Sequence, residues 1–277
     1  PIGKIMDRFV DIDVDGILGY DFLSRFVTRI DYERTLISFF EPDSFGTPLG
    51  AADIEAPLIH NVFSVEAVLD SLFRGTFLID TGASNSILQK SFADEHRLRE
   101  GRESLEITIL GAGGEEQAFL ARFDSFEIGD FTIEDPVFVL SDAESGIAAF
   151  EDISGIIGNN ILHRFSLTLD YKRQRIYLEP NGLFDDPFIR DRSGIRCERH
   201  EDGRVTLYSV IPGSPGDEAG LLEGDEIVSI DGREVADIER MEEIFEILRD
   251  SERKTLQLEI IRKGRKTSVS LLLKNYI

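Results

Sequence analysis

Hydrophobic and polar residues alternate along much of the chain before residue 180, and this period of two predicts β-strands. Residues 63–69 alternate, residues 76–79 lead as a strand to an aspartate, and residues 105–110 and 117–123 flank a glycine-rich turn. Residues 92–98 have the spacing of a short helix. The pattern therefore predicts a mainly β fold in which short strands are joined by turns.

A different pattern begins after the turn-forming residues 181–187. Residues 215–220 begin with proline and end with glycine, as a short helix does, and the Asp-Gly pair at 231–232 predicts a hairpin. A longer helix is expected near residues 238–249. Its apolar face is made by Met241, Ile244, Phe245 and Leu248. These signals predict a second, α+β domain at residues 190–277.

Residues 77–84 read Phe-Leu-Ile-Asp-Thr-Gly-Ala-Ser, so an apolar strand ends on Asp80 and a tight turn of small residues follows. Two carboxylates that share one proton can activate water to attack a peptide carbonyl, and small hydrogen-bonding neighbours let them lie close together. We therefore expect Asp80 to be catalytic, to be supported by Thr81, Gly82 and Ser84, and to need a second aspartate. The alternative is that Asp-Thr-Gly is only a strand-ending turn.

A second motif at residues 153–162 reads Ile-Ser-Gly-Ile-Ile-Gly-Asn-Asn-Ile-Leu, and its second glycine opens a helix-like segment. Over about residues 57–180, the two motifs together resemble the retropepsin-like and pepsin-like aspartic proteases. The resemblance implies a closed, β-barrel-like lobe at residues 44–183, in which the second motif packs across the loop bearing Asp80. It also implies an endopeptidase whose partner is a peptide or protein substrate.

The glycine-rich turn at residues 111–116 differs from a phosphate-binding loop, because no Lys-Ser/Thr follows it and no helix begins there. We interpret it as the tip of a β-hairpin. In a retropepsin-like lobe, Gly111, Ala112 and Gly113 are candidates for the flap that closes over substrate, since glycine adopts positive φ freely. An ordinary surface hairpin is the alternative.

The chain also contains an internal repeat. Residues 16–26 read Gly-Ile-Leu-Gly-Tyr-Asp-Phe-Leu-Ser-Arg-Phe and align with residues 155–165 at an offset of 139 positions. Residues 1–43 are therefore expected to be the C-terminal tail of a first protease lobe, whose own Asp-Thr-Gly would precede Pro1. The partner of Asp80 is then expected in a missing N-terminal lobe or in a second chain.

Two alternatives to this two-lobed enzyme stay open. In the first, the chain is active only on homodimerisation, because another copy contributes the second aspartate. In the second, the chain is a catalytically incomplete scaffold that binds peptides without cleaving them. A second Asp-Thr-Gly in the upstream sequence would favour the two-lobed enzyme over both alternatives.

Residues 214–232 closely resemble the PDZ domains of bacterial proteases, with a match over residues 193–274. In a PDZ fold an extended peptide adds to a strand beside a helix, and backbone amides hold its terminal carboxylate. The resemblance predicts a groove for a peptide C-terminus formed by Ser193, Gly194, Ile195, Arg196, Met241 and Phe245. Ser193 stands where the familiar loop has an apolar residue. Arg196 either assists carboxylate capture or is solvated.

Composition narrows the function. The 277 residues are 42% hydrophobic, which suffices for packed cores, and no apolar run is long enough to cross a bilayer. The formal net charge of −23 repels a phosphate backbone, so no nucleic-acid partner is expected. From the resemblance alone we expect a bacterial protein that is periplasmic or otherwise extracytoplasmic.

The sequence predicts no metal and no cofactor. Its lone cysteine, Cys197, cannot form an internal disulfide. The four histidines, which lack the spacing of zinc ligands, are His60, His96, His163 and His200. Residues 11–16 begin like an EF-hand calcium loop, but Phe22 occupies the twelfth position, where a bidentate acid is required.

Overall fold

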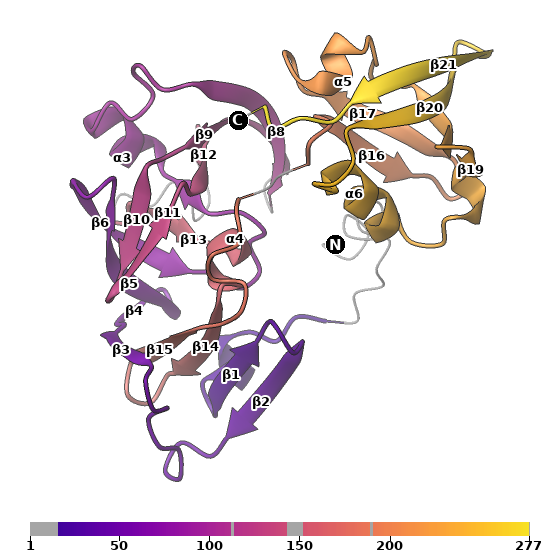
Figure 1. Ribbon diagram of the computed structural model, residues 1–277. Helices are drawn as coiled ribbons and strands as arrows, with labels where there is room; N and C mark the ends of the chain where they lie inside the picture. Colours follow the sequence, from indigo (N-terminus) through magenta and orange to yellow (C-terminus); the bar gives the residue numbers. More distant parts are fainter. Residues whose placement is uncertain (1–15, 112–113, 143–151, 189–190, 277) are drawn as a thin grey trace. The chain divides into compact units, whose positions relative to one another are not determined.

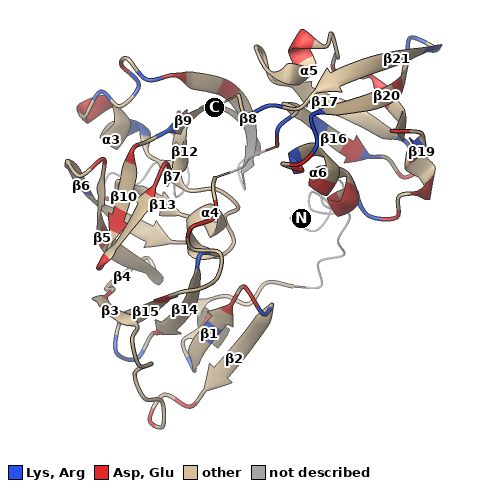
Figure 2. Ribbon diagram, in the orientation of Figure 1, with Lys and Arg blue, Asp and Glu red and all other residues tan. Residues whose placement is uncertain are grey.

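The computed structural model describes residues 16–111, 114–142, 152–188 and 191–276 (Figure 1). The chain forms two compact units, one made mainly of residues 18–188 and the other mainly of residues 189–277. Acidic residues recur along the ribbon of both units (Figure 2), consistent with the net charge of −23. Two features expected from the sequence lie outside the described residues, namely most of the acidic run at 11–16 and the hairpin tip at Ala112 and Gly113.

Two β-sheets build the larger unit. In the described residues, the first has the strand order β2 (Leu36–Phe40), β1 (Val27–Asp31), β14 (Phe165–Asp170), β15 (Arg175–Pro180), β3 (Ala52–Glu55). The second has the order β11 (Phe131–Glu134), β10 (Ser125–Ile128), β5 (Val62–Leu69), β6 (Phe73–Ile79), β13 (Gly155–Ile157), β7 (Ile87–Leu88), β12 (Val137–Ser141), β9 (Gly114–Arg122), β8 (Ser104–Gly111), with β4 (Leu58–Ile59) paired to β5. The short helices are α2 (Tyr20–Leu23), α3 (Lys90–Glu95) and α4 (Asn159–Leu162).

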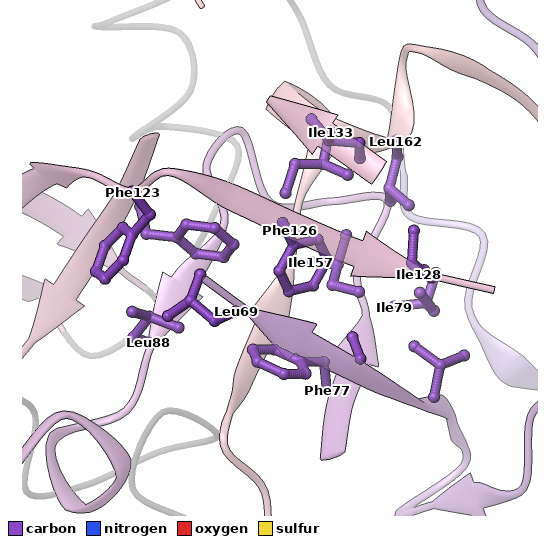
Figure 3. Packing of buried hydrophobic residues seen from close by; sticks show 14 of the residues in the cluster. Leu69, Phe77, Ile79, Leu88, Phe123, Phe126, Ile128, Ile133, Ile157 and Leu162 are labelled. Carbon is purple, nitrogen blue, oxygen red and sulfur yellow. The ribbon is translucent and has the colours of Figure 1, made fainter. Parts of the chain in front are cut away.

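Alternation along the strands determines which side chains fill the core of this unit. In β5, Phe63, Val65 and Ala67 share one face of the strand and are buried, as the period of two predicts. In the core (Figure 3), Phe77 of β6 meets Phe126 of β10 edge to face, with ring centroids 5.2 Å apart. Buried side chains from both sheets belong to one core. The prediction of a mainly β fold for this unit is confirmed.

Helix α3 differs from the helix predicted at residues 92–98, because it begins at Lys90 and ends at Glu95. It ends there because Arg97 adopts the left-handed region at φ 52°, and the Leu98 amide donates to the Ala93 carbonyl at 2.9 Å. This closing turn brings Leu98 back into the core. Spacing alone could not separate the helical residues from the turn that follows them.

The two segments of the internal repeat have the same local structure. Helices α2 and α4 are related by the 139-residue offset found in the sequence. Each follows a glycine with extended backbone, Gly19 at φ −99° and Gly158 at φ −102°. Each is followed by an antiparallel hairpin, β1–β2 in the first repeat and β14–β15 in the second. Residues 19–40 therefore fold like the end of the lobe that carries Asp80.

The two hairpins pair symmetrically. Strands β1 and β14 run antiparallel, and Arg29 lies opposite Thr168, which is its own counterpart in the repeat. The offset of 139 residues also exchanges the two neighbouring pairs, because it relates Thr28–Leu169 on one side to Ile30–Leu167 on the other. The two repeats are thus related by a local two-fold axis that passes through the Arg29–Thr168 pair.

The two hairpins differ in what covers them. Ile176 and Leu178 of β15 are fully buried, whereas their repeat counterparts Ile37 and Phe39 of β2 are 53% and 41% exposed. Strand β3 pairs with β15, while β2 ends its sheet within the described residues. One face of this strand carries the exposed Ile37 and Phe39, and these two residues are here called the β2 face. The first repeat thus has an apolar face whose equivalent in the second repeat is part of a core.

The smaller unit is an α+β domain, as predicted. In the described residues its strands have the order β16 (Ile195–Arg199), β17 (Val205–Val210), β18 (Glu226–Ile230), β20 (Thr255–Arg262), β21 (Arg265–Leu272), with β19 (Arg233–Glu234) paired to β18. Its helices are α5 (Pro215–Glu218), the 3-10 helix η2 (Val235–Asp237) and α6 (Met241–Arg249). Helix α6 begins later than residue 238 because Arg240 has extended backbone, at φ −115° and ψ 137°.

Candidate functional site

Asp80 lies at the end of a buried strand. Strand β6 ends at Ile79, and β13 runs parallel to it with Ile157 opposite Ile79. The Asp80 amide donates to the Ile157 carbonyl at 3.0 Å, and the Asp80 carbonyl accepts from the Ala83 amide at 3.2 Å. The backbone on both sides of the carboxylate is therefore fixed by hydrogen bonds, one across the strands and one within the turn.

The turn after Asp80 orients its carboxylate. Oδ1 of Asp80 accepts a hydrogen bond of 2.8 Å from the Gly82 amide. A Cβ atom at Gly82 would lie 3.2 Å from the same oxygen, a tight contact, so glycine suits this position. Asp80 is half-buried, and within the described residues Oδ2 has no hydrogen-bond partner. One carboxylate oxygen is thus held by the loop while the other stays available.

The second motif supports the Asp80 loop through two asparagines. The Asn159 amide donates to the Ala83 carbonyl at 2.8 Å, and its side-chain Nδ2 donates to the Thr81 carbonyl at 2.8 Å. The Asn160 amide donates to the Ser84 carbonyl at 3.2 Å. Thr81 and Ser84, predicted as supporting residues, therefore take part through their carbonyls. Sequence reasoning found this motif but did not single out its two asparagines.

Gly158 makes this close approach of two backbone segments possible. A Cβ atom there would lie 2.4 Å from the Asn85 carbonyl oxygen, closer than side-chain carbons approach backbone. The Gly158 amide donates to Oγ of Ser86 at 3.0 Å, and Oδ1 of Asn160 accepts from the Ser86 hydroxyl at 2.7 Å. The predicted packing of the second motif across the Asp80 loop is thus a contact between 83–86 and 158–160.

A residue of the first repeat is hydrogen-bonded to Asn159, which supports the Asp80 loop. The Tyr32 hydroxyl donates to Oδ1 of Asn159 at 2.7 Å. Burial raises the pKa of Tyr32 to about 12, so this hydroxyl keeps its proton at neutral pH. The repeat counterpart of Tyr32 is Tyr171, whose ring meets that of Tyr20, the counterpart of Asn159, at 5.4 Å. Each contact joins the first repeat to the second, so the same two positions meet twice, as the two-fold relationship requires.

The candidate flap is placed only in part. Strands β8 and β9 are neighbours in the larger sheet, as the hairpin interpretation requires, and Gly111 ends β8. Ala112 and Gly113 lie outside the described residues, so the flap remains a prediction. In the part of the chain that the structure describes, no hydrogen bond or ion pair joins Asp80 to another carboxylate, and no His, Cys, Asp and Glu cluster could hold a metal ion.

The loop before β16 contains a carboxylate of its own. Asp191 accepts hydrogen bonds from the Ser193 amide at 2.8 Å and from the Gly194 amide at 3.0 Å, and also from the Ser193 hydroxyl. Oδ2 of Asp191 further accepts from Arg196 at 3.0 Å and from the Tyr276 hydroxyl at 3.2 Å. Arg196, expected either to assist carboxylate capture or to be solvated, is instead paired with Asp191.

Gly194 is required at this loop by its backbone. Its φ is +71°, and a Cβ atom would lie 2.1 Å from Cβ of Ser214. Of the other residues predicted for the peptide groove, Ile195 and Met241 are buried in the core of the smaller unit, and Phe245 packs partly against that core. Strand β16 begins at Ile195, because residues 191–194 form the turn around the Asp191 carboxylate.

Comparison with known proteins finds a similar family for each of the two units. Residues 65–161 match the family model described as aspartyl protease, and residues 206–262 match that of the PDZ domain. The chain therefore contains one segment similar to the aspartyl protease family and, after it, one segment similar to PDZ domains. A search of curated proteins found no match. No helix among the described residues is long and apolar enough to span a membrane.

Solved structures similar to the chain fall into the same two groups. A retropepsin-like aspartic protease from Rickettsia conorii is 24% identical, with 48% of this chain and 92% of that chain covered and a TM-score of 0.36. The HtrA3 PDZ domain bound to a phage-derived ligand is 23% identical, over 29% of this chain and 82% of that chain, with a TM-score of 0.26. The PDZ domain of EpsC from Vibrio cholerae is 21% identical, over 29% and 79%, with a TM-score of 0.24.

Proposed function

We propose that this protein is an aspartic endopeptidase in which Asp80 supplies one of two catalytic carboxylates. The observation that carries the proposal is the mounting of Asp80. Its carboxylate follows a buried strand, one oxygen is held by the Gly82 amide, and Asn159 and Asn160 support the loop from behind. This arrangement lies within the segment that matches the aspartyl protease family.

The chemistry requires two carboxyl groups that share one proton. The ionised group accepts a proton from water, whose oxygen attacks the carbonyl carbon, while the protonated group donates its proton to the carbonyl oxygen. The carboxyl group that took the proton from water then donates it to the amide nitrogen, and the C–N bond breaks. The other carboxylate takes a proton back from a hydroxyl of the intermediate, which leaves a carboxylic acid and an amine. Asp80 cannot fill both roles at once, so a second carboxylate must lie beside it.

A second lobe of the same kind is the source of that carboxylate in this proposal. In the second repeat, the counterpart of the β2 face is buried in the core of the lobe that carries Asp80. The symmetric pairing about Arg29 and Thr168 extends this relationship to the first repeat. A lobe bound over Ile37 and Phe39 would bring its own aspartate towards the local two-fold axis. That lobe is either an upstream part of the protein or a second copy.

The PDZ domain is proposed to bind peptide and so to recruit long substrates to the protease lobe. Tethering a binding domain to a catalytic one raises the local concentration of a bound chain near the active site. A catalytically incomplete, peptide-binding scaffold is the second candidate, because one carboxylate alone is present at the Asp80 loop in the described residues.

Hydrolysis measured over a range of protein concentrations tests the proposal. The chain is incubated with a mixture of internally quenched peptides, and new termini are identified by mass spectrometry. A monomer is expected to show little or no cleavage, whereas the rate per molecule rises with concentration if a second copy supplies the aspartate. If no new termini appear at high protein concentration or after an upstream lobe is added, the peptide-binding scaffold is supported instead.

A further inference from the structure

The loop that precedes β16 carries its own carboxylate ligand. In a PDZ domain the backbone amides of this loop bind the terminal carboxylate of a peptide. In this chain the amides of Ser193 and Gly194 already donate to the Asp191 carboxylate, at 2.8 Å and 3.0 Å. The third amide, that of Ile195, donates to the Ser193 hydroxyl oxygen at 3.2 Å. All three amides therefore have partners inside the protein.

We propose that Asp191 is an internal occupant of the carboxylate loop, so this PDZ domain excludes peptide C-termini and binds internal extended segments instead. The inference rests on the proposed role of the domain as the peptide-binding module. In this inference Asp191 determines which of two classes of ligand the domain binds, peptide C-termini or internal segments.

The number and origin of the donors distinguish this arrangement from a simple turn. A turn closed by an aspartate side chain needs one or two local amides. Asp191 also accepts from Arg196, on β16, and from Tyr276, at the far end of the domain's sequence. Burial favours the neutral form of Arg196, but the electrostatic effects of Asp191 and of the nearby Tyr276, Tyr208 and Cys197 together outweigh it and raise the pKa of Arg196. Donors from three parts of the domain thus converge on one carboxylate.

The hydrogen bonds of Ser193 explain why this loop has a serine where other PDZ domains have an apolar residue. Its hydroxyl donates to Asp191 and its oxygen accepts from the Ile195 amide, so one side chain completes both contacts. Ser193 and Ser214 are both fully buried, and Ser214 packs against Gly194. An apolar side chain at residue 193 would leave the Ile195 amide free to bind an incoming carboxylate.

An incoming C-terminus would have to displace Asp191. That carboxylate lies two and three residues from the amides it binds, so its effective concentration at the loop is on the order of millimolar or higher. A second carboxylate placed beside it would also be repelled. An internal segment has no such charge, and within the described residues β16 pairs only with β17, so its other edge can accept an added strand.

Peptide libraries displayed with a free C-terminus test the proposal on the full chain. They are selected against the unmodified protein and against Asp191→Ala, and the sequences enriched by the variant are synthesised with a C-terminal acid and with a C-terminal amide. We expect Asp191→Ala to bind the acid at least about tenfold more tightly than the amide. The unmodified protein should show no preference for the acid, and it should enrich sequences from a library displayed internally.

Two further variants distinguish the effect of removing the Asp191 carboxylate from the effects of losing a negative charge or of unfolding the domain. Asp202→Ala removes an acid from an exposed hairpin of the same domain, where it pairs with Arg204, and should leave the acid-to-amide ratio unchanged. Ser193→Leu releases the Ile195 amide and should shift the ratio towards the acid even if Asp191→Ala does not fold.

The outcomes are distinct. An acid preference of tenfold or more in the unmodified protein overturns the role of Asp191 while leaving peptide binding by the domain intact. If neither variant acquires an acid preference, the loop is not a carboxylate site that Asp191 occupies. If no library of either kind yields a binder to any form of the protein, both this inference and the proposed peptide-binding role fail.

Discussion

The hydroxyl of Tyr32 donates a hydrogen bond of 2.7 Å to Oδ1 of Asn159, so the first repeat is joined directly to the support of the Asp80 loop. Nδ2 of the same asparagine donates to the Thr81 carbonyl. The Asn159 side chain therefore connects Tyr32, which lies 127 positions earlier in the chain, to the turn that holds the candidate catalytic carboxylate. The hairpin of the first repeat is part of the structure that positions Asp80.

Tyr32→Phe should destabilise the larger unit by about 1 kcal/mol, and by up to about 3 kcal/mol if Oδ1 of Asn159 stays unpaired. The free energy of unfolding is measured by urea denaturation. Tyr20→Phe is the matched control, because Tyr20 is partly exposed and meets Tyr171 through its ring. Equal effects of the two substitutions would show that the Tyr32 hydroxyl contributes nothing specific.

Alkaline pH should weaken the fold through the same tyrosine. Burial raises the pKa of Tyr32 from 10.0 to about 12, so the unfolded chain loses its proton first. The contribution is fully present below pH 10 and is lost as the pH rises towards 12, by on the order of 3 kcal/mol. Tyr32→Phe should reduce this loss in denaturation measured between pH 9 and pH 12, while burial of Tyr171 maintains part of it. An unchanged slope in the variant would contradict the assignment.

Charge on the β2 face should prevent a second lobe from binding. Ile37→Glu and Phe39→Glu place a carboxylate on a surface whose counterparts, Ile176 and Leu178, are fully buried. We expect at least about a tenfold loss of association, measured by sedimentation and by activity against concentration, with unchanged circular dichroism. Leu49→Glu is the control, because Leu49 is 99% exposed. If all three variants associate alike, the β2 face is not the site of assembly.

The sequence predicted the parts of the fold that depend on local pattern. Alternation in residues 63–69 indicated β5, and the two motifs with their glycines located Asp80 and the segment packed against it. The offset of 139 residues also predicted that the end of the lobe occurs twice, and the two short helices have this offset in the structure. These features follow from side-chain periodicity and from backbone positions that only small residues can occupy.

Contacts between distant segments could not be predicted in the same way. Nothing local to Tyr32 indicates that it reaches Asn159, and nothing near Asp191 indicates that Arg196 and Tyr276 both donate to it. The sequence did show that Ser193 departs from the usual apolar residue, but not that its hydroxyl has two partners. Such pairings depend on tertiary packing. The boundaries 1–43, 44–183 and 190–277 stay predictions.

Removal of the PDZ domain should separate recruitment from catalysis. A chain that ends at Phe188 retains the contact between this ring and Arg164, whose guanidinium lies 3.8 Å from the ring centroid. In the assembled enzyme we expect cleavage of a long protein substrate to fall more than cleavage of a short peptide, because only the long chain can occupy both domains. Equal proportional changes in the two rates would show that the PDZ domain does not recruit substrate.

Turnover of a quenched peptide by Asp80→Asn in the assembled, active enzyme tests the central claim most directly. An amide cannot share a proton as a carboxylate does, so we predict a loss of at least about 10²-fold to 10⁴-fold in kcat with an unchanged unfolding midpoint. Asp130→Asn, at an exposed turn of the same lobe, should retain full activity. Unchanged turnover in Asp80→Asn would remove this residue from the mechanism and contradict the account.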